Sequence, residues 1–349
     1  MMETYNTDIL KAAASDLPWE LLQGKNILVT GATGLIGSCV VEILMSRGCD
    51  DYTVYASGRN PERIKSRFEK YNGRKNFQVI CHDVTCPLEC NIDFHYIISA
   101  ASGANPVLYS TDPIGVMKAN IMGTENLLSY GIGHNLKKFV YISSGDVYGQ
   151  GDGRIFTEDY SGYVDPLDIR SSYTSSKRAA ETLCISYAHQ HNIEVCIARP
   201  CHVYGPHYTE SDTRAYAQFI NNAIAGHDIV MKSHGEQFRS WCYVVDAAIG
   251  ILYVLLKGEN CNAYNIADEK SNITIHEFAE IIADICGTKI IFDIPTEAES
   301  KGFNRVNKSV FSTAKLSGLG WSIAGSINNK IRRTIMELKA QNNNDVYNI

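Results

Sequence analysis

Two residues four positions apart, Tyr173 and Lys177, have the types needed for proton transfer. Residues at this spacing lie on one face of a helix, so the phenol and the ammonium can point into the same cleft. A nearby cation stabilises a phenolate, which lets a tyrosine act as a base below its solution pKa. Taken alone, such a pair is more often a surface tyrosine beside a solvated lysine, so the interpretation depends on other residues.

A hydroxyl and a carboxylate follow an apolar run upstream of this pair. Residues 138–143 predict a strand, and Ser144 and Asp146 come directly after it. In open parallel sheets, ligands bind at the carboxyl ends of the strands. Asp after a strand also often satisfies backbone N–H groups in a turn, so Asp146 is either a second acid/base or a turn residue.

A glycine-rich turn lies near the amino terminus. The apolar run 26–30 leads into Gly31-Ala32-Thr33-Gly34-Leu35-Ile36-Gly37, and an apolar helix is expected after it. Glycine lets the backbone approach a pyrophosphate closely, and the helix start adds partial positive charge. Any strand-to-helix turn can use glycine, but this one opens an alternating chain, as a dinucleotide fingerprint requires. We therefore expect a dinucleotide site here.

The elements that must position these residues alternate regularly over the first 200 residues. Predicted strands are 26–30, 53–57, 77–81, 96–99, 138–143 and 194–199, and predicted helices are 36–46, 61–70, 113–130 and 175–189. Near-continuous apolar strands separated by helices indicate a parallel sheet covered on both faces. The expected fold class is α/β, a Rossmann-type doubly wound parallel sheet with a smaller C-terminal substrate-binding lobe.

After residue 200 the pattern becomes less regular. A loop is expected at 201–212, helices near 214–225, 245–256, 272–286 and 324–339, a strand near 229–232, and a frayed end, QNNNDVYNI. These patterns predict a dinucleotide-binding domain over 24–200, to which 243–266 returns. They also predict a substrate-binding lobe over 201–242 and 267–335, with terminal extensions at 1–23 and 336–349.

Composition excludes several classes of protein. The net charge of −6 argues against a general nucleic-acid binder. The longest apolar run, 247–256, is about half a membrane span. The start, MMETYNTDIL, shows no signal-peptide pattern. Eleven scattered cysteines indicate reduced thiols. A cytoplasmic location is therefore expected, without nucleic-acid or membrane partners.

The densest group of metal-ligand types is Cys81, Cys86 and Cys90, with His82 beside them. Their spacing matches no common zinc pattern, and no second paired set follows. Ordinary strand and loop cysteines are therefore expected, and no metal.

Taken together, these motifs resemble the extended short-chain dehydrogenases/reductases, in their nucleotide-sugar epimerase/dehydratase branch. The resemblance covers about residues 24 to 335. It rests on the glycine turn, on Tyr173 with Lys177, and on the segments 100–102, 120–124, 143–149, 199–206 and 239–246. Segments 101–128 and 177–182 are most similar to UDP-glucuronate decarboxylases.

The resemblance implies an enzyme that modifies a nucleotide-linked sugar through a 4-keto intermediate, with bound NAD or NADP, as a homodimer. The implied catalytic residues are Tyr173 (acid/base), Lys177 (lowering its pKa and holding the nicotinamide ribose), Ser144 (bonding the same sugar oxygen) and Asp146. The implied cofactor-binding residues are Gly31, Thr33, Gly34, Leu35, Ile36, Gly37, Ser57, Arg59, Asp83, Val84, Ala100, Ala101, Asn120, Tyr173 and Lys177. The implied substrate-binding residues are Ser102, Ser144, His202 and Arg239.

Three positions depart from the pattern of this branch. His202 stands where Asn is common, Gly145 precedes Asp146 where dehydratases carry an Asp-Glu pair, and Ser175 replaces a Glu typical of decarboxylases. The step after oxidation therefore stays open among epimerisation, dehydration and decarboxylation. Alternatives to the whole interpretation are a one-way ketoreductase or dehydrogenase, and a non-catalytic dinucleotide-binding protein.

The end of the second predicted strand bears on the choice of cofactor. An NAD site typically has a carboxylate there for the ribose 2′-hydroxyl, but this chain has Ser57-Gly58-Arg59-Asn60. Arg59 could pair with a 2′-phosphate and Ser57 could donate to it, which favours NADP. Alternatively, Arg59 stacks on adenine or faces water, and the site binds NAD.

Overall fold

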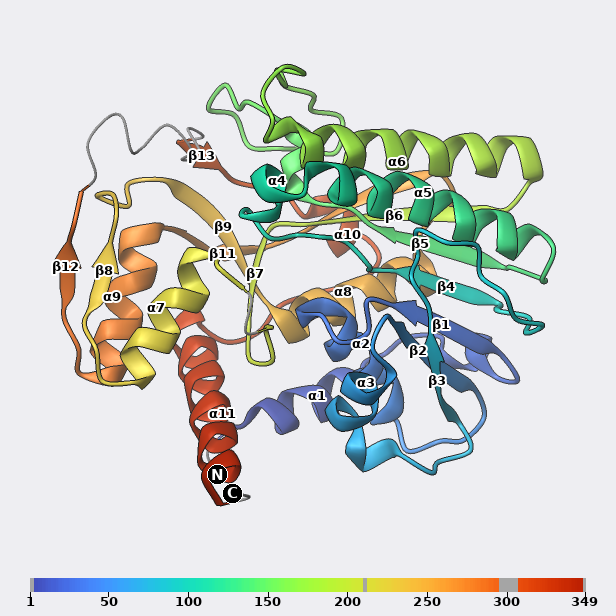
Figure 1. Cartoon of the computed structure of the whole chain (residues 1–349), viewed down its shortest axis with the longest axis horizontal. Helices are drawn as coiled ribbons and strands as arrows, with labels where there is room; N and C mark the ends of the chain where they lie inside the picture. The colour runs from blue at the N-terminus through green and yellow to red at the C-terminus, as the bar shows by residue number, and fades with distance from the viewer. Residues whose placement is uncertain (1–2, 210–211, 295–306, 348–349) are drawn as a thin grey trace.

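In a computed structural model, which describes residues 3–209, 212–294 and 307–347, seven parallel strands form the sheet of the larger lobe (Figure 1). Their spatial order is β10 (Asn262–Ile266), β6 (Glu194–Pro200), β5 (Lys138–Ile142), β4 (Tyr96–Ser99), β1 (Asn26–Thr30), β2 (Thr53–Gly58) and β3 (Phe77–Cys81). The chain switches direction between β1 and β4, as in a doubly wound sheet, where the ligand cleft opens at this point. The predicted fold class is confirmed.

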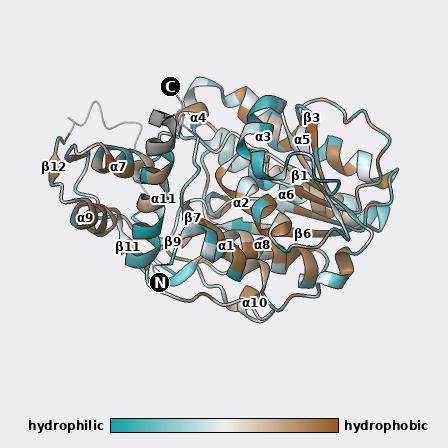
Figure 2. Cartoon of the chain, turned by 90° about the horizontal axis from the view of Figure 1, so that it is seen from below, coloured by the Kyte–Doolittle hydropathy of each residue, from teal (hydrophilic) through white to brown (hydrophobic). Residues whose placement is uncertain are grey.

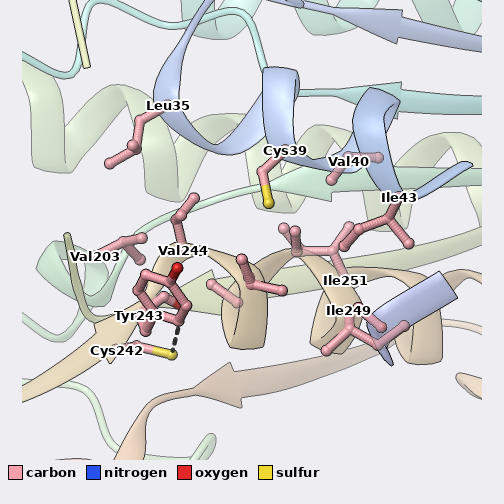
Figure 3. Packing of buried hydrophobic residues seen from close by; sticks show 14 of the residues in the cluster. Leu35, Cys39, Val40, Ile43, Val203, Cys242, Tyr243, Val244, Ile249 and Ile251 are labelled. Carbon is pink, nitrogen blue, oxygen red and sulfur yellow. Dashed lines mark hydrogen bonds between the residues drawn. The ribbon is translucent and has the colours of Figure 1, made fainter. Parts of the chain in front are cut away.

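Helices cover both faces of this sheet. On one face lie α2 (Leu35–Met45), α3 (Pro61–Arg67) and α8 (Val244–Lys257), and on the other lie α5 (Pro113–Ile132) and α6 (Ser171–His191) (Figure 1). Figure 3 shows Cys39 and Ile43 of α2 facing Val244 and Ile251 of α8. Because both faces are covered, the central strands are almost wholly apolar, and they are mainly brown in Figure 2.

The smaller lobe has a sheet of its own, with β9 (Phe238–Tyr243) at its centre. Strand β9 pairs with β7 (His202–Tyr204), β11 (Asp268–Thr274) and β13 (Lys308–Ser309). A separate pair is β8 (Ile229–Met231) with β12 (Ile290–Phe292), and the helices α7 (Ala215–Ile224) and α9 (Ile275–Cys286) lie beside it (Figure 1).

Two sequence predictions fail in this lobe. The expected loop 201–212 contains β7, and the expected helix 272–286 begins only at Ile275, because residues 268–274 form β11. A capping box between Thr274 and Glu277 sets the start of α9, since each side chain bonds the other's backbone N–H. Strand β9 carries Arg239 in a short run of mixed polarity, so no apolar pattern predicts it.

Both ends of the chain contribute helices. Helix α1 (Tyr5–Ala13) packs on α2 and α8, and α11 (Ile327–Tyr347) contacts α7 and α9. Helix α11 continues past its predicted end at 339 to Tyr347, and fraying of this end stays a prediction; residues 348 and 349 lie outside the described residues. The division into domains stays a prediction, although β10 lies in the large sheet. Across the described residues, no helix combines the length and apolarity that a bilayer crossing requires.

The buried Lys330 of α11 forms ion pairs with α8 of the larger lobe and β11 of the smaller lobe. Lys330 is 2% exposed, and its Nζ lies 2.8 Å from Asp246 Oδ2 on α8 and 3.5 Å from Asp268 Oδ2 on β11. The Ser271 hydroxyl donates to Asp268 Oδ2 at 2.7 Å. Burial raises the pKa of Asp246 to about 6, although Lys330 opposes this. A buried carboxylate (Asp268) and a half-buried one (Asp246) therefore depend on one ammonium.

Lys330→Met is expected to cost about 3–5 kcal/mol of stability, because the buried Asp268 and the half-buried Asp246 lose their cation. Urea unfolding measures the loss. The loss should be smaller at pH 5 than at pH 8. The folded pKa of Asp246 lies above that of an unfolded carboxyl, so the folded variant takes up a proton as the pH falls.

Arg332→Met is the matched control, because Arg332 is exposed on the same helix. We expect this control to change the free energy of unfolding by no more than about 0.5 kcal/mol. A loss in Lys330→Met that matches the control, or that is the same at both pH values, would show that the carboxylates do not depend on Lys330.

Candidate active site

The turn after β1 brings the backbone against the end of β4. Gly31 has a φ of +63°, and a Cβ there would lie 2.8 Å from Ala100 O and from Ala101 N. A Cβ on Gly37 would lie 2.4 Å from Gly31 O. Gly34 is the N-cap of α2 and makes no side-chain cap bond, so the first N–H groups of the helix stay available to a ligand. This glycine cradle at a helix start fits a pyrophosphate.

The other residues predicted for this turn differ in burial. Leu35, the first residue of α2, is buried, whereas Thr33 and Ile36 are half-buried. Ala100 and Ala101 are also half-buried, and their N–H groups both donate to Thr30 Oγ1, at 3.2 and 3.3 Å. These bonds hold the ends of β1 and β4 together beside the glycine cradle.

The ends of β2 and β3 carry the residues predicted for the adenosine end. Ser57 is 1% exposed, and its hydroxyl has no hydrogen-bond partner among the described residues. Arg59 is exposed. The pKa of Asp83 is lowered, mainly because its carboxylate accepts the Thr85 N–H at 2.9 Å, and partly by Arg59. Val84 is buried against α5. A buried free hydroxyl and an exposed guanidinium thus lie where the ribose of a dinucleotide is expected.

A chain of hydrogen bonds connects the loop after β4 to α6. The Ser102 hydroxyl donates to Asn120 Oδ1 at 2.9 Å, and Asn120 Nδ2 donates to Ser176 Oγ at 2.9 Å. Asn120 is 1% exposed, and Ser176 is the neighbour of Lys177. Ser102 and Asn120, predicted for substrate and cofactor, therefore meet in one network that positions α6.

Tyr173 and Ser144 come together at the carboxyl end of β5. Helix α6 begins at Ser171, four residues before its predicted start, so Tyr173 lies in its first turn. Tyr173 is 4% exposed, and the Ser144 hydroxyl lies near enough to its phenol to lower the pKa of Tyr173. Lys177 is 2% exposed, and its Nζ donates to Ile142 O at 2.7 Å and lies 5.8 Å from the centre of the Tyr173 ring.

The electrostatics around Tyr173 differ from the expectation. Burial raises the pKa of Tyr173, and the Asp146 carboxylate raises it further, whereas the Ser144 hydroxyl and Arg214 lower it. Burial also lowers the pKa of Lys177 to about 7. In this structure the pKa of Tyr173 is therefore raised rather than lowered, because burial outweighs the neighbouring cations.

Asp146 follows Ser144 in the short helix η3 (Gly145–Tyr148). Solvent reaches its side chain, yet burial raises its pKa, with Arg239 and Arg170 opposing. The carboxyl is therefore surrounded by protein atoms while solvent still reaches it, and its charge acts on Tyr173. Among the described residues no backbone N–H donates to the carboxylate, so the turn interpretation gains no support.

Arg239 and His202 form a cationic corner of the site. Arg239 is 5% exposed, its Nη1 donates to His202 Nε2 at 2.9 Å, and its buried Nε lacks a partner among the described residues. Burial lowers the pKa of His202 well below its usual value, so the ring is neutral, with its proton on Nδ1. Within the described part of the chain, Arg239 has no carboxylate within 4.0 Å, so the corner suits an anion.

The aromatic ring of Phe311 fills the space beside Gly145, the residue before Asp146. A Cβ on Gly145 would lie 2.3 Å from Phe311 Cζ and 2.6 Å from Phe311 Cε1. Phe311 is 1% exposed and packs on Tyr148 and Phe156. This packing leaves no room for a side chain at position 145, so glycine is required there.

Sequence reasoning missed three residues of the site. Tyr109 stacks on Tyr173, Arg214 acts on its charge, and Phe311 covers Gly145. Tyr109 lies within the segment 101–128 on which the resemblance rests, which is the one signal for it. No motif or spacing marks Arg214 or Phe311.

The cysteine group at 81–90 makes ordinary contacts. His82 Nε2 bonds Cys86 O at 3.0 Å, and Cys90 Sγ lies 3.1 Å from the Tyr130 hydroxyl. Across the described residues, no group of three or more His, Cys, Asp or Glu side chains is arranged to hold a metal ion.

Comparisons with known proteins agree with this geometry. Residues 27–267 match a family model described as the NAD dependent epimerase/dehydratase family. UDP-glucuronic acid decarboxylase 6 of Arabidopsis thaliana is 34% identical over 299 residues, which cover 84% of this chain and 83% of that protein. UDP-glucuronic acid decarboxylase 1 of Xenopus tropicalis is 32% identical over 92% of this chain and 74% of that protein.

Solved structures share the fold. UDP-glucuronic acid 4-epimerase from Bacillus cereus, in complex with UDP-glucuronic acid and NAD, superposes with a TM-score of 0.76 at 23% identity, over 90% of this chain and 99% of that one. A dTDP-glucose 4,6-dehydratase from Streptomyces venezuelae, with NAD, gives 0.78 at 20% identity, over 91% and 98%. At these identities, the likeness shows the fold alone.

Proposed function

Because the chain belongs to the NAD-dependent epimerase/dehydratase family, we propose that it oxidises a nucleotide-linked uronic acid at C4 and decarboxylates the 4-keto product. The observation that carries this proposal is the buried Arg239, which has an unpartnered Nε beside neutral His202. A nucleotide diphosphate supplies the anion that this corner lacks. The most similar relatives named above are UDP-glucuronic acid decarboxylases, which supports UDP-glucuronic acid as the substrate.

The cofactor would lie along the glycine turn. Gly31, Gly34 and Gly37 would hold its pyrophosphate, and the free Ser57 hydroxyl its ribose. When bound, the dinucleotide accepts a hydride from the sugar and later returns it.

Tyr173 would take the proton of the C4 hydroxyl during this oxidation, with Ser144 bonded to the same oxygen. The buried phenol has a raised pKa, so it holds its own proton in the resting protein and must release it to solvent before it can take the sugar proton. The Ser144 hydroxyl and the positive charge of Arg214 favour the phenolate that the step requires. After decarboxylation Tyr173 would return the proton to C4–O.

Asp146 would act on the carbon skeleton. A ketone at C4 makes the uronic acid a β-keto acid, so the C5–C6 bond breaks, CO2 leaves, and the electron pair forms an enolate between C4 and C5. This enolate must gain a proton at C5. The raised pKa of Asp146 suits it to give that proton.

The packing at Gly145 supports decarboxylation over dehydration. Loss of a C6 hydroxyl as water needs an acid for the departing oxygen as well as a base at C5. The Phe311 ring fills the space in which a side chain at 145 would lie. Loss of CO2 needs no such acid, so the single carboxylate of Asp146 suffices.

Incubation with a panel of nucleotide sugars, followed by mass spectrometry and NMR, tests the function. We expect UDP-glucuronic acid to lose CO2 and give a pentose-linked product. An unchanged mass with inversion at C4 would instead establish an epimerase, and loss of water a dehydratase. Consumption of one dinucleotide for each sugar would establish the one-way dehydrogenase. Failure of every sugar to react would favour the non-catalytic alternative.

We also propose that the cofactor site accepts NADP at least as well as NAD. Strand β2 ends in Ser57 and Gly58 without a carboxylate that would repel a 2′-phosphate. The free Ser57 hydroxyl and the exposed Arg59 support pairing with that phosphate.

Arg59→Ala is therefore expected to weaken NADP binding about tenfold at low salt and to change NAD binding less than twofold, since one charge-assisted contact is lost. Calorimetry with both oxidised cofactors measures this. Arg63→Ala is the matched control, because Arg63 is exposed on the helix that follows. Clearly tighter NAD binding by the unmodified protein would end the NADP proposal.

A homodimer is proposed through α5. Four large apolar side chains are exposed on this helix: Ile114 (67%), Met117 (38%), Met122 (41%) and Ile132 (40%). A second copy of α5 would cover them. Met117→Lys should shift the protein toward the monomer in sedimentation velocity, whereas Met336→Lys, at an equally exposed methionine on α11, should not. A monomeric unmodified protein would rule the proposal out.

The cysteines support the proposed cytoplasmic location. All eleven are free thiols, and Cys39, Cys184, Cys196 and Cys242 are buried. Reduced thiols persist where glutathione and thioredoxin keep proteins reduced.

A further inference from the structure

A second tyrosine, Tyr109, lies flat against Tyr173. The ring centroids are 4.5 Å apart and the planes differ by 12°. The two residues are 7% and 4% exposed. Tyr109 belongs to α4 (Leu108–Thr111), a single turn in the segment between β4 and α5 (Figure 1). The proposed acid/base therefore has one face of its ring covered by another phenol.

Ordinary core filling is the simplest explanation of a buried aromatic pair, but the surroundings of this pair are not those of a core. Tyr109 and Tyr173 cluster with Val116 and Leu108, apart from the two large apolar cores that cover the sheet. The charges of Asp146 and Arg214 act on both phenols. The pair therefore lies beside charged groups of the site.

The chain holds Tyr109 in place from two sides. On one side, the Ser172 hydroxyl of α6 donates to Tyr109 O at 3.4 Å. On the other, the Thr213 hydroxyl, just before α7 of the smaller lobe, donates to Asn105 Oδ1 at 2.7 Å. Asp112 ends the turn by accepting the Gly115 N–H at 3.0 Å, as the N-cap of α5. The segment that carries Tyr109 is therefore bonded both to α6 and to the residue before Arg214, the N-cap of α7.

We propose that Tyr109 is a positioning residue for Tyr173, whose ring it holds in the plane from which the phenol reaches the sugar hydroxyl. The stacked ring also excludes water from one face of the reacting phenol. The expected effect on turnover rests on the proposed function, but the contact between the two rings does not.

The hydroxyl of Tyr109 adds a second, separable effect. Groups that face Tyr173 come from each neighbouring element: Asp146 and Ser144 from η3 and its cap, Arg214 from the start of α7, and Lys177 from α6 itself. The hydroxyl of the stacked Tyr109 is among the groups that lower the pKa of Tyr173. Tyr109→Phe keeps the stacked ring and removes only this hydroxyl.

The first test needs no substrate. NMR of protein labelled at tyrosine 13Cζ follows the titration of each phenol, and the resonance absent from Tyr173→Phe identifies that of Tyr173. We expect Tyr109→Phe to shift the titration of Tyr173 to higher pH than in the unmodified protein. An unshifted titration would overturn the role of the hydroxyl.

The second test separates positioning from folding. Tyr109→Leu should lower kcat about ten- to a hundredfold, because misplacement of a reacting group by about 1 Å has effects of this size. The KM for the nucleotide sugar and the affinity for the dinucleotide should change less than threefold. Tyr109→Phe should restore kcat to within about threefold of the unmodified protein, with its pH profile displaced to higher pH.

Tyr71→Leu is the matched control, since Tyr71 is 3% exposed and packs on Phe68 and Phe77, away from the cleft. This control should lose stability yet keep kcat and its pH profile. Equal kcat in Tyr109→Leu and the unmodified protein would overturn the positioning role. So would equal losses in Tyr109→Leu and Tyr71→Leu. Absence of turnover in the unmodified protein would instead count against the proposed function, and the NMR titration would still decide the contact.

Discussion

Tyr173→Phe is expected to lower turnover about a hundred- to ten-thousand-fold, the usual effect of losing a positioned acid/base. Phenylalanine keeps the ring that stacks on Tyr109 at 4.5 Å, so the local packing survives. Only the phenol hydroxyl, whose pKa the Ser144 hydroxyl lowers, disappears. Affinities for dinucleotide and nucleotide sugar should therefore change less than threefold, and the loss should fall on kcat.

Steady-state kinetics, with calorimetry for both ligands, measures this split. Tyr187→Phe is the matched control, because it removes a hydroxyl from the same helix, where it bonds Ser129 Oγ at 2.8 Å. The control should turn over within twofold of the unmodified protein. If Tyr173→Phe did so as well, the phenol would have no part in the proton transfer.

The raised pKa of Tyr173 predicts how the rate of the oxidation step changes with pH. The phenol must lose its proton before the sugar is oxidised, and burial makes this loss harder. The rate of the oxidation step should therefore rise with pH through the neutral range.

The large sheet could be predicted from sequence because each of its strands is a short, mainly apolar run of residues. Strands such as β4 and β5 are covered on both faces, so every residue in them is buried and the run is apolar apart from one terminal residue, Ser99 in β4 and Lys138 in β5. The sheet of the smaller lobe gives no such signal. Strand β7 has three residues and begins with His202, and β9 carries Arg239 within its run. The polar residues that could bind an anion also interrupt the apolar run, so the sequence pattern does not predict these strands.

The site divides in the same way. Tyr173 and Lys177 lie one turn apart on the same helix, and Ser144 follows a buried strand. Their sequence positions alone therefore predict that they lie close together. Tyr109 and Phe311 reach the site from distant segments, which only the folded chain brings together. The pKa of Tyr173 likewise depends on burial by those segments, so its direction could not be inferred from the neighbouring lysine.

Asp146→Asn is expected to separate the two halves of the reaction. The amide keeps the size and the backbone bond to Ser144 Oγ at 3.1 Å, but it cannot give or take the C5 proton. Oxidation at C4 by way of Tyr173 should persist. Product formation should fall about a hundredfold or more. Stopped-flow absorbance should then show reduced dinucleotide that forms at the normal rate and decays slowly.

Asp146→Glu is the informative counterpart, because it restores a carboxylate whose reach is longer by one methylene. A misplacement of about 1 Å can lower a rate a hundredfold, so partial recovery would show that reach sets the rate. In the unmodified protein, reaction in heavy water should leave solvent deuterium at C5 of the product. Product formation by Asp146→Asn at the unmodified rate, with deuterium still at C5, would mean that another group supplies the proton. The carboxylate would then act only through its charge on Tyr173 and Arg239.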